Sequence, residues 1–522
     1  MVTPSDSATR EALNVVSYDR SVLPPRPRAR EATGRVTGDV IADRIGPISR
    51  AHVRIVGVLL LIMTSGVLAA VAAVAPARFV RFSEARPILT ELAGKLPPEL
   101  NSLTQTQLEA AWPGWIAAHD RDVRARLDQG DEDTIVNWML FGTSFTSRPR
   151  AVLGVVESGA AGDQELVLRR TIELIQGRLD DLVKALAAPG TDERRLFARA
   201  LLQRRGLRFA TAADRDAVRE HLLGAMMRVA GEQEQIDQEL AATSDRDGTT
   251  EFVRRSRLFR TRGLSLDTSL VANYSVEQAL AAMNAQGVLA PGAVRRVAIV
   301  GPGLDFADKD VGFDFYPQQT LQPFAALDSL ERLGLAPSSG SEIVALDISP
   351  RIVDHVKRAQ ARAVKNVSYT LNLPLPKSVP WLPEVRTYWK SFGDRIGAPA
   401  TTPTSKATVD VADVRAVRIR PSAVRRLSVL DVNIVTDRLD VEPFDLVIAT
   451  NVFIYYDVLD QALALANVAA MLKPGGFLLA NVSVPELPSV RMRPVDTTTI
   501  LYARTGTENI RDFMVWYQAA TK

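Results

Sequence analysis

The sequence of 522 residues predicts an α/β domain at its C-terminus, preceded by an all-α region and one N-terminal transmembrane helix. Three observations predict this class. From residue 295 onward, short β-branched runs alternate with helical segments, which is typical of a parallel sheet covered by helices. Residues 83–290 carry apolar side chains at helical spacing. Residues 55–77 form an apolar run without a single charged side chain.

The N-terminal region predicts a tail followed by a membrane segment. Residues 1–54 are polar and irregular, which indicates a disordered tail. As a helix, residues 55–77 would be about 34 Å long, enough for a hydrocarbon core of about 30 Å. Small residues at Ala73 and Ala75 leave a cleaved signal sequence as the alternative. Four basic residues lie within twenty positions on each side, so charge does not decide the orientation.

The composition excludes several kinds of chemistry. The chain has no cysteine, which excludes a thiolate nucleophile, a cysteine zinc site and an iron–sulfur cluster. Its four histidines lie far apart in sequence, so we expect no metal site. Lys and Arg (63) nearly balance Asp and Glu (60), and the local arginine runs lack interleaved aromatic residues. We therefore expect no nucleic-acid partner.

The helical region at 83–290 contains no catalytic motif. Its acidic pairs, Asp120 with Asp122 and the group at 131–133, are best interpreted as helix caps and solvated charges rather than catalytic carboxylates.

The α/β domain is predicted to occupy residues 291–522. We expect its strands at 297–300, 343–346, 445–449 and 477–482. We expect its helices at 322–333, 350–364 and 459–472. Residues 373–428 interrupt the alternation and are too many for a connection, so they predict an insertion beside the site.

Polar or flexible residues follow the predicted strands. The first strand ends at Gly301 and Gly303, which allow the backbone to approach a ligand closely. The second ends at Asp347, whose carboxylate could accept both hydroxyls of a ribose; the alternative is a helix cap. The third runs into Asn451, for which the alternative is a structural turn. Carboxyl ends of parallel strands form the ligand-binding edge of an open α/β sheet.

Together these features resemble class I S-adenosylmethionine (SAM)-dependent methyltransferases over residues 290–485. The resemblance rests on the glycine turn, the acidic strand end, FDLVIATN at 444–451 and LKPGGFLL at 472–479. Through the blocks at 431–433 and 444–457, the chain most resembles the chemotaxis-receptor (CheR-type) protein methyltransferases. The resemblance implies a Rossmann-like methyltransferase domain with SAM as its cofactor.

The resemblance also implies roles for single residues in cofactor binding. Gly301 and Gly303 would lie by the methionine part of SAM. Asp347 would hold the ribose hydroxyls, and Asn433 would lie by the adenine.

Two further residues would line the methyl-transfer pocket, namely Asn451, which would also contact the cofactor, and Tyr455. Thr450 replaces the arginine that the CheR type carries, and the loop after Gly303 lacks that type's paired glutamates. Asp457 and Asp460 are candidate bases, although their position at a helix start favours caps.

These features predict a membrane-anchored, SAM-dependent methyltransferase of unknown acceptor, for which a protein carboxylate is one candidate. Because SAM is made in the cytosol, we expect the sheet domain there, held at the cell membrane by residues 55–77. The first alternative is a catalytically degenerate fold, acting as an exported binding or scaffold module. The second, a dinucleotide-binding enzyme, is disfavoured by a missing third glycine and by Pro302, which lacks an N–H.

Overall fold

The computed structural model describes residues 77–151, 161–241, 263–264, 270–307, 313–402, 410–484, 486–505 and 508–521. The predicted tail at 1–54 and residues 55–76 of the predicted membrane segment lie outside these ranges. Among the helices that are described, none combines the length and the apolar character needed to cross a membrane.

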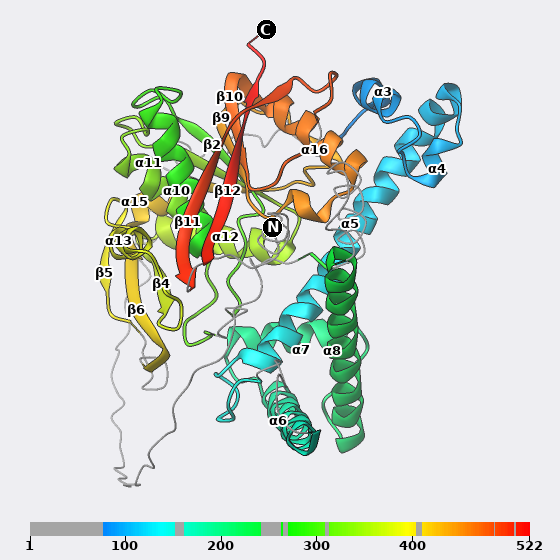
Figure 1. The fold of residues 1–522 in the computed structure, drawn as a ribbon, viewed down its shortest axis with the longest axis vertical. Helices are drawn as coiled ribbons and strands as arrows, with labels where there is room; N and C mark the ends of the chain where they lie inside the picture. The colour runs from blue at the N-terminus through cyan, green and yellow to red at the C-terminus, as the bar shows by residue number, and fades with distance from the viewer. Residues whose placement is uncertain are drawn as a thin grey trace, which may run out of the picture. The chain divides into compact units, whose positions relative to one another are not determined.

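A seven-stranded sheet forms the centre of the C-terminal part (Figure 1). Its strands are β2 (Arg296–Val300), β3 (Glu342–Asp347), β7 (Leu427–Asp431), β9 (Phe444–Ala449), β10 (Leu472–Ala480), β11 (Met492–Thr505) and β12 (Glu508–Ala519). The order across the sheet is β11-β12-β10-β9-β2-β3-β7. The five strands from β10 to β7 are parallel, and β12 is antiparallel to both of its neighbours. The four predicted strands are confirmed, while β7, β11 and β12 were not predicted.

The strand order reverses beside β2. From β2 the chain proceeds outward through β3 to β7, and it then returns to the other side of β2 to form β9 and β10. Such a reversal opens a crevice outside the carboxyl ends of the two central strands, here β2 and β9.

Two helical layers cover the sheet, because neighbouring residues of each strand face opposite sides. Val297 and Ile299 join one core with α10 (Leu270–Ala285), α11 (Gln322–Arg332) and α12 (Pro350–Val364). Ala298 and Val300 join the other with α3 (Phe82–Glu91), α16 (Val458–Met471) and the start of α5 (Gln105–Phe141). The predicted helices that became α11, α12 and α16 are confirmed.

The helices of residues 83–290 do not form one body. The helices α3 and α10 pack on the sheet, whereas α6 (Ala161–Ala187), α7 (Glu193–Arg204) and α8 (Ala212–Ala241) gather around the C-terminal half of α5 (Figure 1). These last helices enclose a third core, which also takes in Phe306 from the loop after β2. The remaining short elements are β1 (Arg78–Phe79), paired with β8 (Asp437–Arg438), α4 (Pro98–Asn101), α15 (Pro421–Val424) and the 3-10 helix η1 (Phe453–Tyr455).

The insertion contains a small antiparallel sheet of its own. It consists of β4 (Tyr369–Pro376), β5 (Gly397–Ala400) and β6 (Ala412–Ile419), with α13 (Pro383–Ser391) between β4 and β5. This sheet begins before residue 373, and the last two residues of the predicted insertion, 427 and 428, belong to β7 of the main sheet.

The β11–β12 hairpin extends beyond the main sheet and contacts the insertion. Val515 of β12 pairs with both Ala480, the last residue of β10, and Thr497 of β11. Residues 498–505 therefore project past the carboxyl edge, where Ala503 bridges to Trp381 of the insertion. The last part of β11 and the insertion therefore meet beside this edge.

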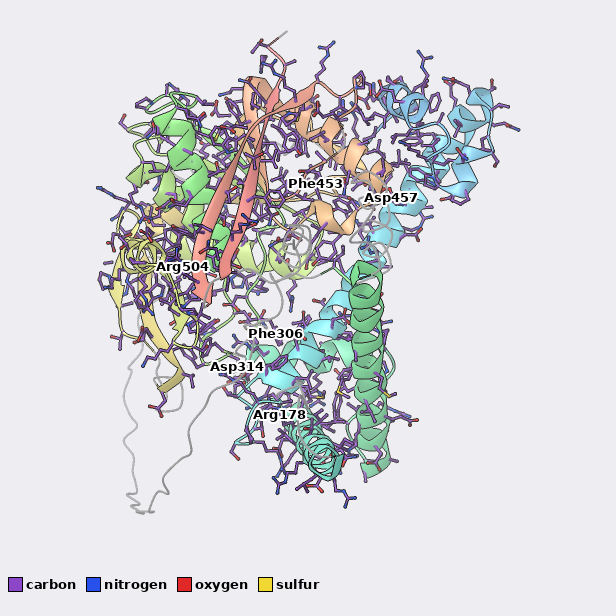
Figure 2. The ribbon with its side chains drawn as sticks, viewed as in Figure 1. Arg178, Phe306, Asp314, Phe453, Asp457 and Arg504 are labelled. Carbon is purple, nitrogen blue, oxygen red and sulfur yellow. The ribbon has the colours of Figure 1, made fainter. Side chains whose placement is uncertain are left out.

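Two buried charged residues, Arg178 and Asp314, form hydrogen bonds with the backbone at the C-terminal end of α5 (Figure 2). The Arg178 guanidinium, with no exposed surface, donates to the carbonyls of Met139 (2.7 Å), Pro149 (2.8 Å), Arg148 (3.1 Å) and Gly142. Its burial lowers the pKa of Arg178 to about 10. Helix ends leave carbonyls without partners, so this cation satisfies groups that the helix cannot.

Asp314, from the loop after β2, satisfies the amides of the same turn. Its carboxylate accepts from Trp138 Nε1 (2.8 Å) and from the amides of Thr143 (3.0 Å) and Ser144 (2.9 Å). Burial alone would raise the pKa of Asp314, but these hydrogen bonds hold it below its ordinary value. The loop after β2 is therefore fixed to α5.

Replacing Arg178 should destabilise the protein strongly. Arg178→Met leaves several buried carbonyls unpaired, and we expect the free energy of unfolding to fall by at least about 3 kcal/mol. Arg170→Met, at an exposed site on the same helix, should change it by less than about 0.5 kcal/mol. Equal urea midpoints for the two variants would contradict this role of Arg178.

Candidate functional site

The candidate site lies at the carboxyl edge of the sheet, where the central strands β2, β3 and β9 end. The register places Asp347 of β3 beside Asp431 of β7, and the amide of Gly301 donates to Leu346 O across β2 and β3 (2.9 Å). Asn451 follows β9, the neighbour of β2 on the other side. The structure thus brings the predicted residues of three separate strands to one edge.

The glycines after β2 adopt backbone conformations that favour glycine. Gly301 has φ 63° and Gly303 has φ 73°, both in the left-handed region. A Cβ at position 301 would also lie 3.0 Å from the Val452 side chain. Both the backbone conformation and the limited space therefore favour glycine at position 301.

Asp347 is a buried carboxyl group with a strongly shifted pKa. Its side chain is 5% exposed, and its Oδ1 accepts from the amide of Ser349 (2.7 Å). The pKa of Asp347 is raised to about 7, mainly by burial and to a smaller extent by the Asp431 carboxylate, while the Ser349 amide and Arg351 oppose the shift. Ser349 is itself the N-cap of α12, so Asp347 closes the turn before that helix and does not cap its first turn.

Helix α5 crosses this edge and contacts the ends of β3 and β7. Arg124 donates to Asp431 Oδ1 (2.8 Å), to Ile348 O (3.3 Å) and to Asp120 on its own helix (3.0 Å). Arg126 donates to Tyr455 O (3.2 Å). Sequence reasoning missed Arg124, because only the tertiary fold places α5 beside residues more than 200 positions away.

The interpretation of Asp120 as a solvated charge or cap is wrong. Asp120 is 9% exposed, and its Oδ1 accepts from Asn433 Nδ2 (2.9 Å) and from Thr436 Oγ1 (3.2 Å). Asp131, in the other acidic group, is also buried and lies 3.1 Å from the Arg351 guanidinium. Both carboxylates join α5 to the sheet domain.

Asn433 is completely buried, and both ends of its amide are bonded within the protein. Its Nδ2 donates to Asp120, and its Oδ1 accepts from the amide of Val435 (3.1 Å). These bonds shape the loop after β7. A place for Asn433 beside an adenine stays a prediction, and the side chain concerned already has protein partners.

Asn451 forms a reciprocal pair with Asn481, the residue after β10. The backbone N–H of Asn451 donates to Asn481 Oδ1 (2.8 Å), and the side-chain Nδ2 of Asn481 donates back to Asn451 Oδ1 (2.7 Å). Asn451 has φ 58°, a conformation that costs energy for a residue other than glycine. The pair holds this strained turn, as the structural alternative for Asn451 requires, and its part in catalysis stays a prediction.

Tyr455 and the candidate bases follow Asn451. Tyr455 lies in η1, half-buried between the two cores of the sheet domain. Asp457 caps α16 by accepting from the amide of Asp460 (3.0 Å), which confirms the cap interpretation. Asp460 is no cap: it is buried, and its Oδ1 lies 2.7 Å from His119 Nε2 of α5. Neither acid is placed as a free base.

The loop before α11 adds buried polar groups that sequence reasoning missed. Asp305 accepts from Tyr316 Oη (2.6 Å) and Gln319 Nε2 (3.2 Å). Among the described residues, Gln318 Nε2 and Thr320 Oγ1 are buried without a hydrogen-bond partner. The polar run PQQT at 317–320 was the available signal. Buried unpaired donors of this kind are rare and mark places where a ligand or water would bind.

Comparison with known proteins yields only weak similarity. No family model matches the sequence, and no curated protein matches it. The solved structures that are similar include the N-methyltransferase NodS from Bradyrhizobium japonicum WM9, with 13% identity, TM-score 0.23 and coverage of 47% of this chain and 96% of that chain. Magnesium protoporphyrin IX methyltransferase ChlM from Synechocystis PCC 6803, with bound SAM, is 12% identical with a TM-score of 0.23. That match covers 51% of this chain and 90% of the ChlM chain. A TehB-like SAM-dependent methyltransferase from Corynebacterium glutamicum is 10% identical with a TM-score of 0.22, and the match covers 48% of this chain and 100% of that chain. At these scores the similarity by itself carries no argument about function.

The pKa of Asp347 predicts how stability depends on pH. Because the folded pKa (about 7) exceeds the unfolded one (3.8), the folded state binds more protons between these values. The contribution of Asp347 to stability is therefore fully present below about pH 4 and is lost as the pH rises through about 7. Asp347→Asn should match the parent protein at pH 4 and exceed its free energy of unfolding by about 2 kcal/mol or more at pH 8. Asp354→Asn, at an exposed site on α12, should show no such crossover, and a parallel pH profile for both variants would contradict the shift.

The Asn451–Asn481 pair predicts that substitutions within it lower the free energy of unfolding, whereas a matched substitution elsewhere does not. Asn451→Gly relieves the left-handed backbone but loses the side-chain bond, so we expect a net loss of about 1 kcal/mol in the free energy of unfolding. Asn366 has a similar φ of 62° but an exposed side chain, and Asn366→Gly should be neutral within about 0.5 kcal/mol. Asn481→Ala should cost about as much as Asn451→Gly. If all three variants unfold at the same urea concentration, the pair does not hold the turn.

Proposed function

We propose that the protein is a SAM-dependent methyltransferase that binds its cofactor in the crevice outside β2, β3 and β9. The observation that carries this proposal is the position of Asp347. A buried carboxyl group ends the strand next to β2, across from a turn that contains two left-handed glycines, at the reversal of the strand order. In open α/β sheets an acid at this place accepts the hydroxyls of a ribose.

The residues present fit an adenosyl group. In the absence of a ligand the pKa of Asp347 is about 7, because burial destabilises its charged form. Two hydroxyl donors would stabilise the carboxylate. Gly301 and Gly303, both with a left-handed backbone, would border the methionine part of SAM.

The two candidate bases already have partners within the protein, which supports a carboxylate as methyl acceptor. Bound SAM supplies an electrophilic methyl group, and transfer requires an acceptor in line within a dry pocket. A hydroxyl or amine acceptor would need a base, but Asp457 caps a helix and Asp460 pairs with His119. A carboxylate is already ionised at neutral pH and needs none. We therefore propose a carboxylate acceptor, in keeping with the CheR-type resemblance, and Tyr455 and Asn451 as the residues that border it.

Membrane attachment belongs to the proposal on sequence grounds alone. Residues 55–77 would hold the chain at the cell membrane, with the sheet domain on the cytosolic side where SAM is available. The exported, non-catalytic module is the alternative, and one observation favours it: Thr450, in place of the arginine, is bonded to Gln322 Nε2 (2.8 Å).

Titration calorimetry of the full chain with SAM tests the proposal. The parent protein should bind SAM, and Asp347→Ala should weaken binding at least about tenfold, because it removes two hydrogen bonds to a charged acceptor. Asp354→Ala, on the exposed side of α12, should bind like the parent protein. Absence of SAM binding by the folded parent protein would reject the function. Equal affinity of the Asp347→Ala variant would reject the ribose assignment alone.

A further inference from the structure

A second concave site lies among the helices α6, α7 and α8, which are extra to the sheet domain. The groove has a volume of about 930 Å³ and is bounded by the C-terminal end of α6, one side of α7, the turn after α7 and the start of α8. Its lining residues all come from positions 180–219. The volume falls within the range of small-molecule sites, about 300–1,000 Å³.

The groove carries an excess of positive charge. Its lining includes five cationic side chains and two acids; the cations are Lys184, Arg199, Arg208, Arg215 and Arg219. Both acids, Asp180 and Asp216, are bonded to the same guanidinium, that of Arg219. Asp214 lies 3.7 Å from Arg208 and adds one more acid beside the groove. In the described part of the chain, Lys184, Arg199 and Arg215 have no carboxylate partner.

Two of these cations are held in place by groups beneath them. Arg199 donates to the carbonyl of Ala187 (3.0 Å), and its guanidinium lies 5.4 Å from the centre of the buried Phe209 ring. Arg215 reaches the carbonyl of Phe209 (3.5 Å). A guanidinium has five N–H donors, so each retains donors for a ligand. Fixing a cation before binding reduces the entropy that a ligand must overcome.

The backbone adds to the same field. Ala212, the first residue of α8, lines the groove, so the positive end of this 30-residue helix points toward it. Thr211 and Asp214 form a reciprocal cap at that end, with Thr211 N donating to Asp214 (2.9 Å), and this acid offsets part of the field. The side-chain cations on α6 and α7 remain.

We infer that this groove binds a small molecule carrying at least two oxyanion groups, either phosphates or carboxylates. Unpaired cations crowded around a hollow repel one another and cost stability, which packing alone does not explain. They come from three different helices, so one anion cannot contact them all with good geometry, whereas a molecule with two could bridge α6 to α8. A nucleic acid fits poorly, since the aromatic ring at the site, Phe209, lies buried beneath Arg199 and offers no stacking face.

Calorimetry of the full chain with inorganic pyrophosphate and with citrate tests this inference. The parent protein should bind at least one of the two, with an affinity that falls as salt rises. Arg215→Gln and Lys184→Gln should each weaken that binding, the former at least about tenfold. Arg205→Gln, at an exposed arginine just after α7 and outside the groove, should leave it unchanged. Arg215→Lys keeps the charge but loses the planar guanidinium, so its affinity for the anion should lie between that of the parent protein and that of Arg215→Gln.

The outcomes separate the ligand classes. Binding of pyrophosphate without citrate indicates phosphates, and the converse indicates carboxylates. No binding of either anion, or binding that the Arg215→Gln and Lys184→Gln variants retain in full while their melting temperatures without ligand match the parent's, would overturn the inference. Binding confined to phosphatidylglycerol vesicles or to a single-stranded oligonucleotide would overturn it as well. Because SAM is absent from these titrations, the result does not depend on the proposed methyltransferase activity.

Discussion

Arg124 donates to Asp431 at the end of β7 and to Asp120 on its own helix, and this bridge fixes where α5 crosses the sheet. The helix has 37 residues and is therefore about 55 Å long. Its first part packs in one core of the sheet domain, its middle in the other, and its last part in the core of α6, α7 and α8. The helical region and the candidate site consequently share one continuous helix. A change in the direction of α5 at Arg124 would move both.

The same crossing determines the electrostatics of the candidate site. Asp120, Asp347, Asp431 and Asp437 gather around the ends of β3 and β7, and burial raises the pKa of Asp347 and of Asp437. Arg124 supplies the nearest positive charge to two of the four acids. Without Arg124, Asp120 and Asp431 would lose the cation that lies between them. Asp347 is compensated separately, by Arg351.

The loop after β2 shows how the other end of α5 contributes. Asp314 of this loop accepts the amides at residues 143 and 144, while Arg178 of α6 takes up the carbonyls of the same turn. Phe306, between Gly303 and Asp314, packs edge-to-face on Trp138 with ring centres 5.4 Å apart. The glycine turn is held on one side by the sheet and on the other by α5. This double anchoring explains why the described polar residues of the loop, such as Asp314, Gln318, Gln319 and Thr320, are buried.

Much of the sheet domain could be predicted from local patterns. The strands β2, β3, β9 and β10 are runs of β-branched and aliphatic residues that end in glycine, acid or amide, and such runs depend only on neighbours in sequence. The strands β11 and β12 were missed because their threonines, arginines and acids suit a half-exposed hairpin, whose pairing and whose bridge from Ala503 to Trp381 join residues that are far apart in the chain or of mixed polarity. Asn481 was missed for a similar reason: it follows the strand end at Ala480, but only its reciprocal bond with Asn451 reveals its importance.

Local patterns were enough to predict the parallel α/β character of residues 290–485 and the location of Gly301, Asp347 and Asn451 at strand ends, since hydrophobic periodicity and turn residues act over a few positions. The surroundings of these residues depend on the tertiary fold. It turned Asp120 from an expected surface charge into a buried acceptor, gave Asn433 two protein partners, and placed Asp460 against His119. The physical reason is that the energy of a polar side chain depends on its burial and its partners, and the contacts Asp120–Asn433 and His119–Asp460 each join residues more than 300 positions apart in the chain.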